Sequence, residues 1–211
     1  MTEPPKTDAL RTPDTLGGVI EAVWTLLGRG AADRRHGFHL PVLATTDEHG
    51  RPEARTVVLR GADRRLGEIR CHTDARSPKA AHLESRPVAA WCFYDKGQRV
   101  QVRASGPITL LTPGSSNDAA ETWDRAGVGS KRCYLAPHAP SRPAAEPSPN
   151  LPGFALANRL TPDEVEPGRA NFMVLVCRVE RLEWLALRHD GHRRAAFTRD
   201  ATGWTETWIE P

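Results

Sequence analysis

The residue types best suited to binding an anion gather between Arg55 and Lys79. The apolar, β-branched run at 55–60 carries an arginine at each end. Farther along, Ser77 can cap a helix and Pro78 suits its first position. Because a helix N-terminus presents free N–H groups and the positive end of the helix dipole, it attracts phosphate. The segment therefore predicts a seat for a phosphorylated cofactor, framed by four cations: Arg55, Arg60, Arg76 and Lys79.

A strand–turn–strand–helix unit would position these cations. The pattern predicts a strand over 52–60, a turn at 61–63, a second strand over 66–73 and a helix over 78–85. Such a unit brings the helix start back beside the first strand, close to Arg55. The alternative is that Arg55 and Arg60 are simply solvated arginines at the ends of a strand.

The remaining elements predict a mainly β fold of a single domain. One helix opens near Thr12 and ends at Gly28 and Gly30, with an apolar stripe at i, i+3, i+4 and i+7. Weaker helices are expected over 115–125 and after Thr161, and a Pro-rich loop over 136–153. The expected strands are 40–46, 52–60, 66–73, 87–94, 100–111, 172–179, 182–187, 194–198 and 204–208. Tight turns between consecutive strands predict an antiparallel meander that curls into a barrel over 12–211, preceded by a disordered tail at 1–11.

Composition limits the functional classes. The formal charge of +3 is too small to indicate nucleic-acid binding by itself. The four cysteines lack a Cys-x-x-Cys pair, so we expect buried, reduced thiols and a cytoplasmic protein. No stretch is apolar enough to span a membrane, and residues 1–6 lack a signal-peptide core.

Several familiar site motifs are absent from the sequence. There is no Gly-x-x-x-x-Gly-Lys phosphate loop and no Gly-x-Ser-x-Gly elbow. The pair Gly127 and Gly129 lacks the third glycine and the preceding strand of a dinucleotide fingerprint. His189 and His192 flank a predicted turn without cysteines or carboxylates at ligand spacing, so we expect no metal site.

For three residues later in the chain, the sequence leaves two possible roles open. Gln101 lies between apolar neighbours on a predicted strand, either as a solvent-facing residue or as a donor aimed at a ligand ring. Trp184 and Arg194 lie on two strands that a turn at Asp190 and Gly191 would join. They are either a cross-strand pair or one wall of a pocket.

In their order and spacing, these residues resemble the pyridoxamine 5′-phosphate oxidase family. The resemblance runs from about residue 36 to Pro211 and is most specific over 72–79, His-Thr-Asp-Ala-Arg-Ser-Pro-Lys. It implies a split β-barrel, antiparallel and Greek-key-like, with a few peripheral helices. It also implies bound FMN, and a homodimer with the FMN sites at the interface between subunits.

The resemblance implies a role for each matching position. Contacts to FMN are implied for the strand residues Arg55, Thr56, Val57, Val58, Leu59 and Arg60, with Arg55 on the phosphate. His72 and Thr73 match the end of the next strand, and Ser77 and Lys79 match phosphate-binding positions. Arg76 would supply the charge that the oxidases usually carry where this chain has Pro78. Gln101, Trp184 and Arg194 match residues beside the flavin ring, and Ser141 matches a serine that reaches the phosphate from the partner subunit.

The resemblance predicts a flavoprotein oxidoreductase that transfers hydride between FMN and a small substrate. Arg194, supported by Gln101, is the candidate donor near flavin N1, and His192 is the best candidate for a general acid or base. The oxidases bind substrate phosphate through an Arg-x-His motif, but this chain has Asp190 in place of the arginine. Their Arg-x-x-x-Ser element is also one residue longer, from Arg125 to Ser130. Flavin binding is thus better supported than pyridoxine phosphate as substrate, and a non-catalytic FMN carrier or redox sensor, or more distantly a haem-handling protein, stays open.

Overall fold

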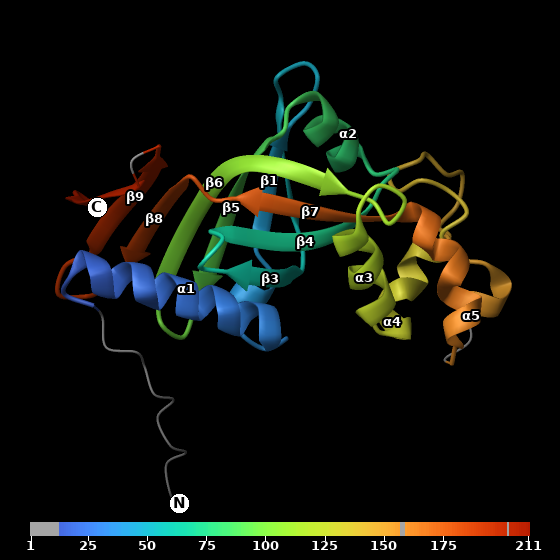
Figure 1. Cartoon of the computed structure of the whole chain (residues 1–211), viewed down its shortest axis with the longest axis horizontal. Coiled ribbons are helices and arrows are strands. Elements are labelled where there is room, and N and C mark those ends of the chain that lie inside the picture. Colours follow the sequence, from blue (N-terminus) through green and yellow to red (C-terminus); the bar gives the residue numbers. More distant parts are fainter. Residues whose placement is uncertain (1–12, 157–158, 202) are drawn as a thin grey trace, which may run out of the picture.

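The protein is an open antiparallel barrel built from two sheets that share a strand (Figure 1). The computed structural model describes residues 13–156, 159–201 and 203–211, so the tail predicted to be disordered at 1–11 lies outside the described residues. Over the described part, the strands are β1 (Val42–Thr46), β2 (Pro52–Thr56), β3 (Leu59–Asp63), β4 (Glu68–Asp74), β5 (Val88–Asp95), β6 (Val100–Leu111), β7 (Phe172–Arg178), β8 (Arg181–Ala186), β9 (Arg193–Asp200) and β10 (Gly203–Ile209). The prediction of a mainly β, antiparallel split barrel is confirmed.

The larger sheet has the order β10-β9-β8-β6-β5-β1-β2, and the smaller one is formed by β3, β4, β7 and the end of β6. The 12-residue strand β6 belongs to both sheets: Val100–Ser105 pairs with β8, and Ile108–Leu111 pairs with β7. At the crossing point, a Cβ on Gly106 would lie 1.9 Å from the backbone oxygen of Arg178. Only glycine lets the two backbones approach this closely.

The helices of the described residues are α1 (Leu16–Ala32), α2 (Pro78–Ser85), α3 (Asn117–Arg125), α4 (Val128–Lys131) and α5 (Pro162–Val165). Short 3-10 turns lie at Gly37–His39, Arg132–Leu135, Gly153–Leu156 and Glu166–Asn171. The helix predicted after Thr161 is confirmed as α5, with a capping box formed by Thr161 and Glu164 and a proline at its first position.

The predicted end of the first helix is wrong. Helix α1 starts after the Thr15 cap and continues through Gly28 and Gly30 to Ala32. Gly30 does not end the helix because it serves packing: a Cβ there would lie 2.7 Å from the Cβ of Phe38.

The predicted strand over 52–60 is also interrupted. It ends at Thr56, and a new strand, β3, begins at Leu59. Between them the Val57 N–H donates to Pro41 O at 2.9 Å while the chain passes from the larger sheet to the smaller one. The turn predicted at 61–63 instead lies at 64–67, where Gly67 has φ +70°, because a bulge lets β3 continue through Gly61.

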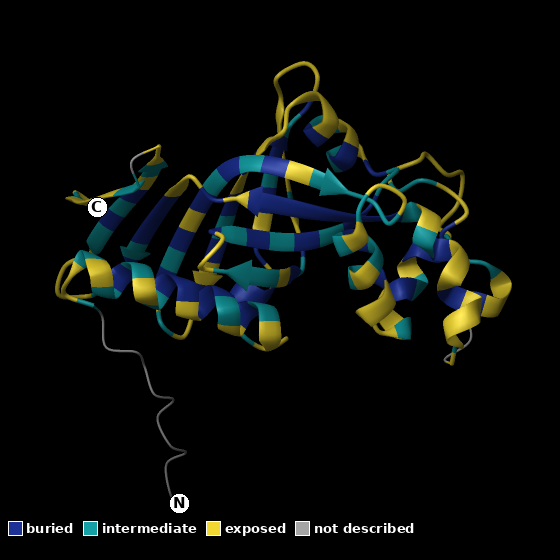
Figure 2. Cartoon of the chain, in the orientation of Figure 1, coloured by how far each residue is buried: buried dark blue, intermediate teal, exposed yellow. Residues whose placement is uncertain are grey.

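The core lies inside the barrel, between the two sheets and α1, as the dark interior in Figure 2 shows. Its largest side chains include Trp91, Trp184 and Phe197, all fully buried. Cys71 and Cys177 are buried as predicted, whereas Cys92 is half-buried and Cys133 is exposed, and all four thiols are free. Among the described residues, no helix is both long and apolar enough to cross a membrane.

Candidate functional site

A cluster of hydroxyl and cationic side chains lies where α2 begins, against β1, β2 and β4. The Lys79 ammonium donates to Thr73 Oγ1 at 2.8 Å, and the Thr73 and Ser77 hydroxyls are 3.1 Å apart. On the neighbouring strand, Arg55 donates to Thr45 Oγ1 at 2.7 Å. Thr45, Thr73 and Ser77 are buried. We call Thr45, Arg55, Thr73, Ser77 and Lys79 the anion seat.

The anion seat carries more positive charge than the protein neutralises. Burial lowers the pKa of Lys79, and the nearby Arg55 lowers it further. Lys79 makes no ion pair with an acid among the residues that the structure describes, whereas Arg55 contacts Glu53 at 3.0 Å. Buried cations that repel each other are stabilised when an anion enters between them. The donor set, two cations and three hydroxyls, fits a phosphate group.

Two predicted phosphate ligands, Arg76 and Ser77, make contacts that the sequence pattern does not indicate. Arg76 is held by Asp74, at 2.7 and 3.0 Å, and by the backbone oxygen of Ala136 at 2.9 Å. Its charge is thus already paired. Ser77 occupies the N-cap position of α2 and Pro78 follows at the first position, but the Ser77 hydroxyl makes no capping hydrogen bond. That hydroxyl faces Thr73 instead.

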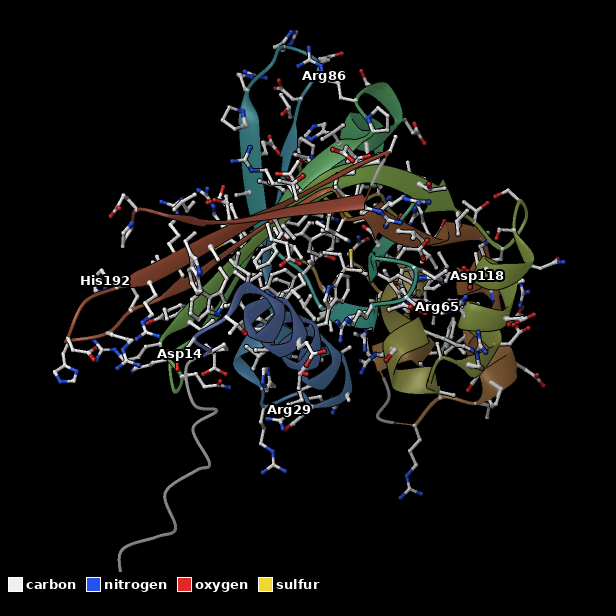
Figure 3. The ribbon with its side chains drawn as sticks, turned by 60° about the vertical axis from the view of Figure 1, so that its left-hand side comes forward. Asp14, Arg29, Arg65, Arg86, Asp118 and His192 are labelled. Atoms are coloured by element: carbon white, nitrogen blue, oxygen red, sulfur yellow. The ribbon has the colours of Figure 1, made fainter. Side chains whose placement is uncertain are left out.

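A second pocket, rich in arginine, lies between β3, β4 and α3. It is lined by Arg60, Arg70, His72, Asp118, Thr122, Arg125, Ala126, Gly127, Ser130 and Val174. Asp118 is bound to Arg70 at 2.7 Å, and Arg70 also contacts Glu68 at 3.0 Å. Figure 3 shows Asp118 on α3. Arg60 has no acidic partner within the described chain, so this arginine pocket is open to a further anion.

His72 is the neutral group of the arginine pocket. Burial lowers the pKa of His72, and Arg60 and Arg70 lower it further, to about 4. Its ring packs edge-on against Phe172, with centroids 4.9 Å apart. At neutral pH the imidazole is therefore uncharged and can accept a hydrogen bond.

His72 is expected to make the protein acid-sensitive. The unfolded chain takes up the proton near pH 6.5, but the folded protein resists it until about pH 4. Stability should fall by about 3 kcal/mol as pH drops through this window, and then level off. Denaturant unfolding from pH 7 to 4 should show a flatter profile for His72→Gln. The exposed His49→Gln is the control, and equal slopes for His72→Gln and the parent would contradict the assignment.

Gln101 and Arg194 share the outer face of the larger sheet, away from α1. Gln101 pairs with Leu185, which pairs with Arg194, so the three form one row across β6, β8 and β9. Arg194 donates to Glu183 at 2.5 Å. Trp184 points to the opposite face, where it is fully buried and its ring packs edge-on to Trp208, with the ring centroids 6.4 Å apart. On this chain Trp184 is a core residue rather than the wall of a pocket.

The remaining predicted residues lie apart from both groups. His192 lies in the β8–β9 hairpin, where its Nδ1 accepts the Arg188 N–H at 3.1 Å, and Figure 3 shows it pointing away from the protein. Ser141 lies in the loop after α4, with φ +68°, beside His138, Arg142 and Asn150. Val57 and Leu59 are buried in the core, and the described residues contain no group of three or more potential metal ligands.

The polar site residues that do gather fall into two sets on one chain. The anion seat lies at the start of α2 and the arginine pocket beside α3, whereas Gln101 and Arg194 lie on β6 and β9. In Figure 1, β9 lies at the opposite end of the molecule from α3. No hydrogen bond or ion pair recorded for the described residues joins the two sets. Sequence reasoning missed Thr45, Arg70 and Glu183. Thr45 lies on the same buried face of β1 as Leu43, so its strand pattern marks it as a core position. Only the pairing of β1 with β2 brings it within reach of the Arg55 side chain.

An open antiparallel barrel with a phosphate-fitting seat at a helix start defines the class of FMN-binding split barrels. The family described as "Pyridoxamine 5′-phosphate oxidase, FMN-binding domain" matches residues 21–112. A pyridoxine/pyridoxamine 5′-phosphate oxidase of Deinococcus deserti is 32% identical over 168 residues, which cover 77% of this chain and 74% of that protein. The chain belongs to this family, and FMN is its cofactor.

Two further comparisons span nearly the whole chain. Pyridoxine/pyridoxamine 5′-phosphate oxidase 2 of Arabidopsis thaliana is 26% identical over 208 residues, or 92% of this chain and all of that protein. The crystal structure of a pyridoxamine 5′-phosphate oxidase-related, FMN-binding protein of Nostoc punctiforme matches with a TM-score of 0.71 and 26% identity. It covers 90% of this chain and 96% of that chain.

Proposed function

We propose that the protein is an FMN-dependent oxidoreductase that transfers hydride between the flavin and a small anionic substrate. The observation that carries this proposal is the anion seat, in which Lys79 has no acidic partner among the described residues, together with a separate arginine pocket. One cationic site fits the phosphate of FMN, and the other is left for the substrate. The bound flavin supplies the hydride chemistry, and the protein supplies binding, orientation and electrostatics.

Each group has a defined part in this proposal. Arg55 and Lys79 hold the FMN phosphate, with hydroxyl donors from Thr73 and Ser77. Arg60 and Arg125 orient an anionic group of the substrate, and the N–H of the neutral His72 ring donates a hydrogen bond to that group. We propose that residues 12–211 form one FMN-binding unit, and His192 stays a prediction as the general acid or base.

The substrate differs from pyridoxine phosphate in the part that reaches the β8–β9 hairpin. Asp190, which stands where the oxidases carry a phosphate-binding arginine, is bound to Arg188 at 2.5 Å. That hydrogen bond lowers the pKa of Asp190, so the acid is charged at neutral pH. A carboxylate repels phosphate. The site therefore favours a substrate whose anionic group enters the arginine pocket alone.

Arg60→Ala is expected to weaken substrate binding selectively. Loss of one charge-assisted contact should raise KM for an anionic substrate about 10- to 100-fold, while FMN affinity changes little. Steady-state kinetics and FMN titration measure the two effects. Arg65→Ala, which removes a cation from the turn after β3, is the control. A fall in FMN affinity as large as the rise in KM would place Arg60 on the cofactor instead.

We also propose a homodimer with FMN bound between the subunits. The outer face of the larger sheet exposes Val42, Val88 and Tyr94 by 39%, 58% and 46%, although a solvent-facing sheet side is normally polar. The same face carries Gln101 and Arg194. A second copy packed there would cover the apolar side chains and bring these two residues beside the flavin ring of FMN bound at the partner's anion seat. Sedimentation of the FMN-loaded protein should give twice the mass of one chain.

The test of the proposed function is a flavin and turnover experiment. The purified protein should bind FMN stoichiometrically, and the flavin should be reduced by a small anionic amine or alcohol under anaerobic conditions. Pyridoxamine phosphate is the first compound to test. Bound FMN that none of a panel of such compounds reduces would support the alternative, a non-catalytic FMN carrier or redox sensor. A protein that ignores FMN would refute both.

A further inference from the structure

One carboxylate on the outer sheet face is surrounded by three arginines from three strands. Glu183 Oε2 accepts from Arg103 of β6 and from Arg194 of β9, each at 2.5 Å, and Glu183 Oε1 accepts from Arg181 at 3.2 Å. The Glu183 side chain is only 8% exposed. Burial alone would raise the pKa of Glu183, but the hydrogen bonds from Arg103 and Arg194 lower it to about 2. The acid is therefore charged at any physiological pH.

Glu183 lies next to the row of residues that contains Gln101 and Arg194. Glu183 pairs with Arg103 across β6 and β8, one row along from the row of Gln101, Leu185 and Arg194. Arg194 is half-buried, and Glu183 is the only acid recorded in an ion pair with it over the described residues. Removal of the carboxylate would leave the Arg194 guanidinium without this partner and beside two other cations.

A purely structural ion-pair cluster would be a simpler explanation. However, Arg103 and Arg181 are 51% and 61% exposed, and such surface pairs contribute little to stability. Burial of the Glu183 carboxylate costs desolvation free energy, which weak pairs with exposed arginines do not offset. The arrangement is better explained by Arg194, because it is the arginine of the cluster that faces the proposed flavin site.

We propose that Glu183 is a positioning residue that fixes Arg194 toward the flavin and sets the flavin reduction potential. The inference rests on the proposed function, in which Arg194 lies near flavin N1. Reduced flavin carries negative charge in that region, so positive charge there favours reduction. Three arginines and one glutamate carry a net charge of +2, whereas three arginines alone carry +3.

Glu183→Gln keeps the shape of the side chain and removes its charge. It should therefore favour the reduced flavin, by about tenfold in the reduction equilibrium, or about 30 mV for a two-electron couple. Arg194→Ala should shift the potential in the opposite direction. Glu206→Gln, which removes an exposed acid from β10, is the control and should leave the potential unchanged. Equilibrium reduction against a reference dye measures all three proteins.

Each outcome decides the inference. A potential in Glu183→Gln that equals the parent's, with FMN bound normally, would overturn the role of Glu183 and leave the proposed function intact. Failure of the parent protein to bind FMN would overturn the proposed function, and this inference with it. If Glu183→Gln does not fold, Glu183→Asp takes its place: it keeps the charge but shortens the side chain, which draws Arg194 back from the flavin and should lower the potential. An unchanged potential in Glu183→Asp would then refute the inference.

Discussion

Lys79→Ala is expected to weaken FMN binding by about 1.5–3 kcal/mol, or roughly 10- to 150-fold in Kd, the scale of a hydrogen bond to a charged group. Lys79 is partly buried, donates to Thr73 and has no acidic partner among the described residues. Burial and Arg55 both lower its pKa, which is the signature of a cation held ready for an anion. Arg55→Ala should have an effect of similar size.

Titration of the protein with FMN, followed by quenching of flavin fluorescence, measures this change. Lys96→Ala in the turn between β5 and β6 is the matched control, because it removes the same charge from an exposed position far from α2. An unchanged Kd for Lys79→Ala would mean that the phosphate binds elsewhere. Riboflavin, which lacks the phosphate, should bind the parent and Lys79→Ala proteins with similar affinity.

Gly106→Ala is expected to destabilise the protein by about 3 kcal/mol or more. A methyl group at this position would lie 1.9 Å from the Arg178 backbone oxygen and 3.1 Å from the Glu180 nitrogen. Because the obstacle is backbone, no side chain can rotate away, and the two sheets must separate. The Glu180 N–H bond to Ser105 O, 3.0 Å long, would be strained first. Denaturant unfolding with FMN absent gives the free energy directly.

Gly28→Ala is the control for this substitution. Gly28 lies inside α1 with no atom within 4 Å of the position of a Cβ, so alanine should stabilise the protein by about 0.5–1 kcal/mol through helix propensity alone. The two glycine variants thus have opposite expected signs. A Gly106→Ala protein as stable as the parent would show that the junction between the sheets is looser than the close approach indicates.

Much of the barrel could be predicted because local patterns coincide with it. The alternation around Gln101, the turn at Gly191 and the proline that starts α2 each specify their own element. The interruption at Val57 and Val58 could not be predicted, because the run is a good strand by composition. It breaks where the chain leaves one sheet for the other, and that is a property of the whole barrel.

The candidate site divides in the same way. The proximity of Arg55, Ser77 and Lys79 could be predicted from the sequence, because a strand–turn–strand–helix unit is local. It could not show that Arg76 is already paired with Asp74, or that Trp184 faces the core, because side-chain direction depends on long-range register. Glu183 was missed for a related reason: its three partners lie on separate strands, up to 80 positions away in the chain.

The length of β6 has a consequence for how the cofactor is retained. Ten residues separate Gln101 at one end from Leu111, which pairs with Val174 of the arginine pocket, and a strand of this length spans up to about 30 Å. If flavin needs groups from both ends, two chains must meet before either can hold it fully. FMN binding and dimerisation then favour each other by mass action, so that dilution of the protein should release its flavin.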